Sequence, residues 1–191
     1  IAKEVGFQLV MNKSGITGQT LNGIDALLII SPLAKSTQRN LTDTEKQAII
    51  DYIRQGGSVI MFIDEEEYRV NLEEYGANDI TRKFGIEVLD DFEVPGNCGA
   101  VTFENEIFDR RREIPCSGVR GIKGGIPASV CMEQGRQISA FVRLDNGGKL
   151  YVALLMGYPD GERNVHKMMK TRWWGKDSRI YMKELLEWAL F

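Results

Sequence analysis

The sequence predicts a single α/β domain over residues 1–191, and three observations lead to this prediction. Two apolar runs, residues 26–30 and 59–63, enclose a segment whose apolar side chains repeat with helical spacing. A third apolar run, residues 150–155, follows a strong turn signal, and the C-terminal segment again has a helical pattern. A strand, a helix and a strand with short connections favour a parallel pair. We therefore expect the three runs to be central strands of a mainly parallel sheet, with 26–30 and 59–63 parallel to each other.

The composition argues against two classes of partner. The 191 residues are 43% hydrophobic, and 24 basic against 27 acidic residues give a formal charge of -3. This balance gives no electrostatic reason to expect a nucleic-acid partner. No apolar run approaches the roughly 20 residues of a membrane-spanning helix, so no membrane span is expected.

The first residues suggest a longer protein. Residues 1–5 have the pattern of a helix end, Gly6 terminates it, and residues 7–11 have the pattern of a strand. Helices average about 11 residues, so this helix is expected to begin before Ile1. We expect a preceding piece that holds one more β-strand, whose place in the sheet appears as an edge or a gap. The sequence does not indicate the localisation; a periplasmic or secreted protein is expected if that piece includes a signal peptide.

The helix between the first two apolar runs has clear boundaries. Thr42 and Glu45 fit a capping box, in which each side chain accepts a hydrogen bond from the other residue's backbone N–H. Gly56 and Gly57 end the helix, because glycine readily adopts the left-handed conformation of a C-cap. Its expected buried side chains are Ala48, Ile49, Ile50, Tyr52 and Ile53.

The remaining elements are expected as follows. Residues 78–84 form a short helix and 86–89 a short strand, whereas 100–103 and 113–118 are strands or loop, and 120–127 has no assignment. Residues 137–144 and 149–156 form a β-hairpin around an Asp-Asn-Gly-Gly turn. A long loop follows at 157–176. The last helix begins at Asp177 or Ser178, and its expected buried side chains are Ile180, Leu185, Leu186, Trp188 and Ala189.

This succession resembles the class I glutamine amidotransferase-like superfamily. The similar segments are TDTEKQAIIDYIRQGG after the first apolar run, GGKLYVALLMGYP, and the terminal DSRIYMKELLEWALF. The chain is most similar to the ThuA-like and related non-catalytic branches, which include the N-terminal domain of an intraflagellar-transport subunit. The resemblance implies a flavodoxin-like three-layer sandwich with a mainly parallel sheet, a late β-hairpin, and a missing first strand before Ile1.

The catalytic pair of that superfamily has no counterpart here. In its enzymes the strand equivalent to residues 59–63 delivers a cysteine nucleophile, but the matching residue is Asp64. Their base is a histidine in a His-x-Glu pair, whereas His166 is followed by Lys167 and Met168. A nucleophilic thiolate requires an adjacent imidazole to form and orient it. Amidotransferase chemistry and a catalytic cysteine are therefore not expected. The widely spaced cysteines predict free thiols rather than a disulfide or a zinc site, at Cys98, Cys116 and Cys131.

The carboxyl ends of parallel strands meet at one edge of a sheet, where ligands collect. The loops after residues 30, 63 and 156 should converge there, and they carry an acidic cluster, the single histidine and two adjacent tryptophans. Each of these features also has a purely structural explanation: the carboxylates can be a solvated helix start, one tryptophan can be buried to anchor the loop, and the histidine can be structural. The predicted ligand-binding residues are Ser31, Asp64, Glu65, Glu66, Tyr158, Asp160, His166, Trp173 and Trp174.

Two functions remain open at this stage. The first is a non-catalytic binding or scaffold domain for a small molecule, a glycan or a protein partner, since paired tryptophans offer a stacking or anchoring surface. The second is a hydrolase of a glycan-type substrate that uses Asp64, Glu65 or Glu66 as acid and base. Neither requires a cofactor, and the glycines of residues 120–125 lack the spacing of a phosphate-binding loop.

Overall fold

The computed structural model describes residues 2–31, 39–63, 71–89, 99–115, 120–132, 134–154 and 177–191. Its main sheet has seven strands in the order β1-β2-β9-β8-β7-β4-β5, and β3 and β6 form a second sheet. The strands are β1 Ala26–Ile30, β2 Ser58–Ile63, β3 Ile86–Val88, β4 Gly99–Thr102, β5 Glu113–Pro115, β6 Ile122–Gly124, β7 Ile126–Cys131, β8 Gln137–Arg143 and β9 Lys149–Leu154. The helices are η1 Ala2–Val5, α1 Gly18–Leu21, α2 Asp43–Arg54, α3 Leu72–Tyr75, α4 Ala77–Thr81, η3 Arg82–Phe84 and α5 Ser178–Leu190.

The main sheet is mixed, so the prediction of a mainly parallel sheet is wrong. β1, β2 and β9 are parallel, as expected for the first two, but the pairings from β9 through β8, β7 and β4 to β5 are all antiparallel. The antiparallel strands β4, β5 and β7 come from residues 99–131, where short runs between glycines and prolines gave no clear period. The predicted hairpin is confirmed, with Arg143 opposite Lys149 in β8 and β9.

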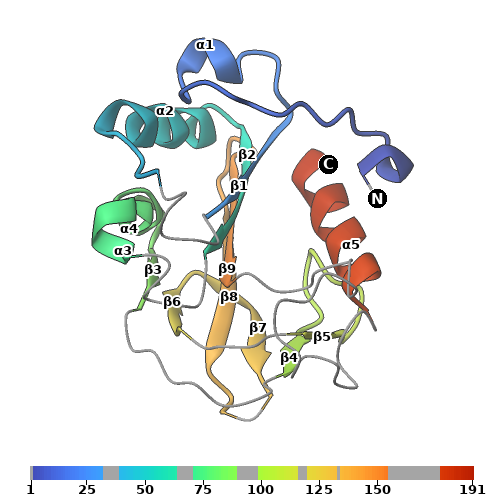
Figure 1. Ribbon diagram of the computed structural model, residues 1–191. Coiled ribbons are helices and arrows are strands. Elements are labelled where there is room, and N and C mark those ends of the chain that lie inside the picture. The colour runs from blue at the N-terminus through green and yellow to red at the C-terminus, as the bar shows by residue number, and fades with distance from the viewer. Residues whose placement is uncertain are drawn as a thin grey trace.

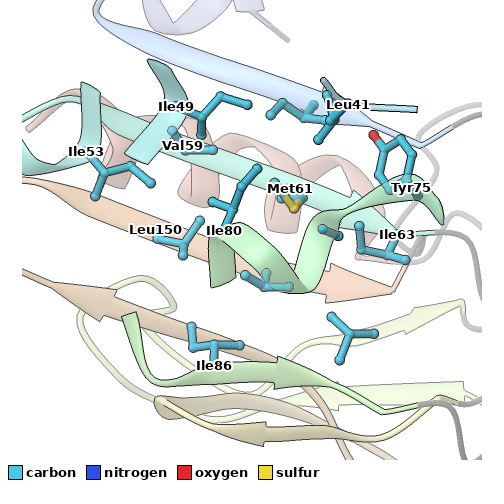
Figure 2. Packing of buried hydrophobic residues seen from close by; sticks show 14 of the residues in the cluster. Leu41, Ile49, Ile53, Val59, Met61, Ile63, Tyr75, Ile80, Ile86 and Leu150 are labelled. Carbon is cyan, nitrogen blue, oxygen red and sulfur yellow. The ribbon is translucent and has the colours of Figure 1, made fainter. Parts of the chain in front are cut away.

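Helices cover both faces of the parallel part of the sheet (Figure 1), with α2, α3 and α4 on one face and α5 on the other. Side chains of β2 alternate between these faces. Val59, Met61 and Ile63 pack in one cluster with Ile49 and Ile53 of α2, and Figure 2 shows these side chains between the helices and the strands. The intervening residues of β2 pack in a second cluster with side chains of α5. β2 is therefore buried on both faces, as its sequence predicts.

The α2 helix has the predicted capping box. The Glu45 backbone N–H donates to Thr42 Oγ1 at 3.3 Å, and the Thr42 backbone N–H donates to Glu45 Oε2 at 3.0 Å. Ile49, Ile50 and Ile53 are buried as expected. Glu45 is also buried, because its carboxylate additionally accepts hydrogen bonds from the Ile16 backbone N–H and from Arg39.

Within the part of the chain that the structure describes, β1 lies at the edge of the main sheet and pairs with β2 alone. Its predicted central position depends on a further strand beside it. Leu28 and Ile30 are 39% and 52% exposed. A wholly apolar run was expected to be covered on both faces, but on the α5 side only Ala26 of β1 packs against the cluster that contains the α5 side chains, whereas Leu28 and Ile30 remain partly exposed. The sheet thus ends where an additional strand was expected, and that strand itself remains a prediction.

Two further expectations about the ends of the chain are corrected. Residues 7–11 form no strand, and Leu9, Val10 and Met11 are exposed because no described strand pairs with them. In α5, Leu185, Trp188 and Ala189 are buried as predicted, but Ile180 is 42% exposed because it lies on the outer side of the first turn. Glu4 in η1 forms an ion pair with Arg179 of α5, which places η1 beside that helix (Figure 1).

Two glycines join the two sheets. β6 belongs to the second sheet and β7 to the main sheet, and only Gly125 separates them. Gly124 has a φ of 80°, and a Cβ atom at this position would lie 2.0 Å from the Gly85 carbonyl oxygen. A Cβ atom on Gly125 would lie 2.8 Å from Ile86 Cγ1. The close approach of β3 to this bend therefore requires glycine at both positions.

The prediction of free thiols is wrong for Cys131, which is buried at the end of β7 and disulfide-bonded. Sequence spacing does not report such a pairing, because a disulfide requires only that two cysteine Cα atoms lie within about 7 Å in the fold. Cys98 and Cys116 lie outside the described residues. Within the described ranges, no helix is long and apolar enough to cross a membrane.

Candidate functional site

The carboxyl ends of the three parallel strands form one edge of the sheet. Ile30 is in register with Phe62, and Ile63 with Leu154. Adjacent strands are about 4.8 Å apart. The chain therefore leaves β1, β2 and β9 at neighbouring points, which is the arrangement on which the predicted site depends. We call this region the carboxyl edge, defined by Ile30, Ser31, Ile63 and Leu154.

Ser31 is the one predicted ligand-binding residue within the described ranges. It follows β1 directly, is 1% exposed, and its backbone N–H donates to the Phe62 carbonyl oxygen at 2.9 Å. This bond extends the pairing of β1 and β2 by one residue and fixes the end of β1 at the carboxyl edge. Because Ser31 is buried, it can contribute to the inner wall of a site but not to its exposed rim.

The other predicted ligand-binding residues lie outside the described ranges. The structure therefore establishes where their segments leave the sheet but not how their side chains lie. The segment with the acidic cluster begins after Ile63, and the long segment with the tryptophans begins after Leu154. The residues concerned are Asp64, Glu65, Glu66, Tyr158, Asp160, His166, Trp173 and Trp174.

Tyr75 lies beside the carboxyl edge, and sequence analysis did not select it. It packs in the same cluster as Ile63 and Leu41, and Figure 2 shows the three side chains together at the end of β2. Burial raises the pKa of Tyr75 to about 12, although the positive charge of Arg39 opposes the shift. Tyr75 is therefore a neutral phenol at physiological pH. The Leu41 backbone N–H donates to the Tyr75 carbonyl oxygen at 3.2 Å, which ties α3 to the segment before α2.

Arg39 and Glu45 form an ion pair near Tyr75. The guanidinium group donates to Glu45 Oε1, and its side chain remains 58% exposed, whereas Glu45 is 5% exposed. Burial would raise the pKa of Glu45, but hydrogen bonds from Arg39, Ile16 and Thr42 outweigh it and lower this pKa to about 2. Glu45 is therefore committed to holding the start of α2. Only Arg39 presents a charge to solvent here, and a capping box in the sequence predicts Glu45 but not this arginine.

Carboxylates are the residues most able to hold a hard metal ion. Among the residues that the structure describes, no three side chains of histidine, cysteine, aspartate or glutamate lie close enough together to do so. Tyr75 is 3% exposed, so it can form part of the inner wall of a site but not a stacking surface. Arg39 is paired with Glu45, and its exposed side chain places a positive charge at the surface near Tyr75.

The opposite end of the parallel strands carries an open groove of about 1340 Å³ between α1, α2 and the C-terminus. Two of its polar side chains, Tyr52 and Lys149, make hydrogen bonds within the fold. Tyr52 donates its hydroxyl to the Ile24 carbonyl oxygen at 2.8 Å, and Lys149 donates to the Trp188 carbonyl oxygen at 2.6 Å. The segments that carry the predicted ligand-binding residues leave the sheet at its other end, so we assign the candidate site to the carboxyl edge rather than to this groove.

No protein-family model matches the chain, and no curated protein matches it. Solved structures, however, share its fold. The mmIFT52 N-terminal domain aligns with a TM-score of 0.69 and 15% identity, over 98% of this chain and 86% of that one. The cytoplasmic protein STM1381 from Salmonella typhimurium LT2 aligns with a TM-score of 0.60 and 16% identity, over 91% and 75% of the two chains.

A second Salmonella typhimurium cytoplasmic protein, STM3548, aligns with a TM-score of 0.57 and 12% identity over 94% of this chain and 81% of that one. At these identities the likeness concerns the fold alone. It agrees with the resemblance to the domain of an intraflagellar-transport subunit at the level of fold, and it does not identify a branch of the amidotransferase-like superfamily.

Proposed function

We propose that this chain is a non-catalytic binding or scaffold domain of amidotransferase-like fold, related to the ThuA-like branches, that binds a carbohydrate-related ligand at the carboxyl edge. The end of β2 carries the argument. Since β2 ends at Ile63, the next residue, at the position of the superfamily's cysteine nucleophile, is Asp64. A carboxylate at this position can accept hydrogen bonds from a ligand, but it is not a thiolate that could form an acyl intermediate.

The state of Cys131, the one cysteine within the described residues, supports the same proposal. Cys131 is fully buried and disulfide-bonded, and a thiol nucleophile must be both free and accessible. The paired tryptophans Trp173 and Trp174 are the residues proposed to stack on a sugar ring. Tyr75 and Arg39 would then lie at the inner and outer sides of the same site.

The proposal is tested with purified chain, an array of immobilised oligosaccharides and a set of 4-nitrophenyl glycosides. We expect binding to at least one oligosaccharide, and a loss of affinity of about tenfold or more, or about 1.4 kcal/mol, for Asp64→Ala and for Trp174→Ala. Asp145→Ala is the matched control, because Asp145 is an exposed carboxylate in the β8–β9 turn, and it should bind as the wild type does. Each variant should change the free energy of unfolding by only about 1 kcal/mol.

Three results would count against the proposal. Absence of binding to every oligosaccharide would reject a carbohydrate-related ligand. Unfolding of the Trp174→Ala variant, followed by circular dichroism, would assign this tryptophan to a structural role. Hydrolysis of a glycoside that Asp64→Asn abolishes would establish the alternative, a carboxylate-dependent hydrolase acting on a glycan-type substrate.

A further inference from the structure

The connection between β4 and β5, residues 103–112, is docked on α5. The Trp188 indole N–H donates to Glu106 Oε1 at 2.8 Å, and the Phe108 ring stacks on the Tyr181 ring with centroids 5.3 Å apart. In both contacts the two partners are side chains that are distant in the sequence. A third contact between the connection and the helix consists of charged groups.

This third contact places one arginine between two carboxyl groups. Arg112 donates from Nε to Glu184 Oε2 at 3.2 Å and from Nη2 to Glu184 Oε1, and the same Nη2 donates to Asp109 Oδ1 at 2.6 Å. The side chains of Arg112 and Glu184 are only 6% and 13% exposed, whereas that of Asp109 is 63% exposed. A single positive charge thus faces two acidic groups, of which one is nearly buried.

The two carboxyl groups also hydrogen-bond to each other. An ionised carboxylate has no donor, so this bond requires a proton on one of the two groups. Burial, together with the bond to Asp109, raises the pKa of Glu184 against the effect of Arg112. The bond from Glu184 lowers the pKa of Asp109, and the charges of Arg112 and Arg110 act in the same direction. In the closed contact a protonated Glu184 therefore donates to an ionised Asp109.

The other charged groups around this contact do not remove the acidic excess. They are Arg110 of the connection, Glu113 of β5, the N-cap residue Asp177, and Lys183 and Glu187 of α5. Arg110 is 69% exposed, so water screens its charge. Lys183 Nζ lies 3.5 Å from Glu187 Oε1, and Asp177 adds a negative charge that acts on Arg112. When Glu184 is ionised, like charges therefore face each other around one guanidinium group.

We propose that Asp109 and Glu184 form a proton-operated latch that holds residues 103–112 against α5, closed in mildly acidic solution and weakened at neutral and higher pH. Loss of the proton from Glu184 removes its bond to Asp109 and sets two carboxylates against each other. Asp109, which is on the exposed side, then turns toward solvent, while the pair of Arg112 and Glu184 remains. This proposal is independent of the ligand at the carboxyl edge.

The latch links protonation to stability in a definite direction. Because the pKa of Glu184 is higher in the folded chain than in the unfolded chain, its stabilisation is fully present below the ordinary value of 4.5 and is lost as the pH rises through the folded-state pKa. The lowered pKa of Asp109 acts in the opposite sense, but its contribution is lost only below the ordinary value of 3.8. Above about pH 5 the latch therefore responds through Glu184.

The test compares wild type with Asp109→Asn by amide hydrogen exchange at about pH 5 and about pH 8. Asparagine still accepts the bond from Arg112 and donates its own N–H to ionised Glu184, so this variant should stay latched at both pH values. The probes are the Ile107 and Phe108 amides, which donate to Asn105 Oδ1 inside the connection.

At about pH 5 these two amides should exchange equally fast in both proteins. At about pH 8 they should exchange faster in wild type, by up to about tenfold for each unit by which the folded-state pKa of Glu184 exceeds 4.5. Carboxyl carbon NMR measures that pKa directly. Glu184 should titrate above 4.5 in wild type, and at lower pH in Asp109→Asn than in wild type.

Asp79→Asn is the matched control for the loss of one negative charge. Lys46 also holds two carboxylates, with Nζ 2.7 Å from Asp43 Oδ1 and 2.7 Å from Asp79 Oδ2, but both of these side chains are exposed. The control should leave the exchange of the Ile107 and Phe108 amides and the titration of Glu184 as they are in wild type.

Titration of Glu184 at or below 4.5 in wild type would overturn the proposal, and this measurement decides even if Asp109→Asn fails to fold. Exchange rates that agree between wild type and Asp109→Asn at about pH 8, or that differ equally at both pH values, would also overturn it. An effect of the same size in Asp79→Asn would assign the change to net charge and reject the latch.

Discussion

The parallel and antiparallel parts of the main sheet differ in the kinds of side chain that they bury. The parallel part, β1, β2 and β9, has apolar side chains on both faces, and β2 and β9 are buried along their whole length. The antiparallel part contains buried polar groups. Ser129 and Ser139 share a hydrogen bond of 2.5 Å between their hydroxyls, and Arg112 pairs with Glu184 of α5. The first part is thus held mainly by apolar area removed from water, with buried polar contacts of Lys149 and Tyr151 in β9. The second part adds contacts between pairs of polar or charged side chains.

This difference has a consequence for substitutions. Apolar burial has no directional requirement, so truncation costs the lost contacts and the cavity that remains. A buried polar contact requires both partners, and removal of one leaves the other without its hydrogen bonds. For the polar pairs of the antiparallel part, Ser129 with Ser139 and Arg112 with Glu184, replacement of both partners is therefore expected to be milder than replacement of one.

The largest effect is expected from Phe62→Ala in β2. Phe62 is 1% exposed and its ring contacts that of Tyr151 edge-on, with centroids 6.3 Å apart. Truncation should lower the free energy of unfolding by about 3 to 5 kcal/mol, measured by urea denaturation. Phe103→Ala, at an exposed position after β4, should lower it by less than about 1 kcal/mol. Similar losses for the two variants would contradict the assignment of the core.

An intermediate effect is expected from Arg112→Met. Arg112 donates to Glu184 Oε2 at 3.2 Å and to Asp109 Oδ1 at 2.6 Å, and it is nearly buried. Its loss should lower the free energy of unfolding by about 3 kcal/mol, because the Glu184 carboxylate, whose side chain is only 13% exposed, loses its partner. The double variant Arg112→Met/Glu184→Met should recover most of the free energy of unfolding that Arg112→Met alone loses. Additive losses in this double-mutant cycle would show that the pair is not coupled.

The smallest effect concerns Glu45, the buried charge beside the parallel part. Its pKa is lowered from 4.5 to about 2, so the folded state binds its proton less readily than the unfolded state does. The stabilisation is complete above pH 4.5 and is lost as the pH falls toward 2. At pH 7 the free energy of unfolding of the wild type should exceed that of Glu45→Gln by about 2 kcal/mol, a value reduced to allow for the solvent exposure of Arg39. A difference that stays constant between pH 6 and pH 3 would disprove this linkage.

The sequence predicted the parallel part well because its signals are local. A continuous apolar run, a capping box and a glycine pair locate β1, α2 and β2, and the Asp-Asn-Gly-Gly turn locates β8 and β9. The exposure of β1 could not be predicted in this way, because an apolar run does not report whether a helix or another strand covers it. That depends on segments that are distant in the sequence.

Most of the antiparallel part was left open for a related reason. β4 and β5, expected as strands or loop, have four and three residues, too few to display a period of two, and β6 of the second sheet also has three. Their positions depend on partners distant in sequence, as when Asp177 accepts a hydrogen bond from Glu113. At the candidate site, the shared edge followed from the parallel order of the strands. Tyr75 and Arg39 could not be selected, because their proximity arises from packing between separate segments.

The bend at Gly124 and Gly125 couples the small sheet to the main sheet, so that neither is expected to open without the other. β6 and β7 are consecutive pieces of one backbone that serve different sheets, and β3 lies too close to the bend for any larger residue to fit. Opening of β3 from β6 would release the turn from which β7 starts, and opening of β7 would remove the support of β6. Native-state hydrogen exchange would therefore register both sheets as one cooperative unit that opens as a whole.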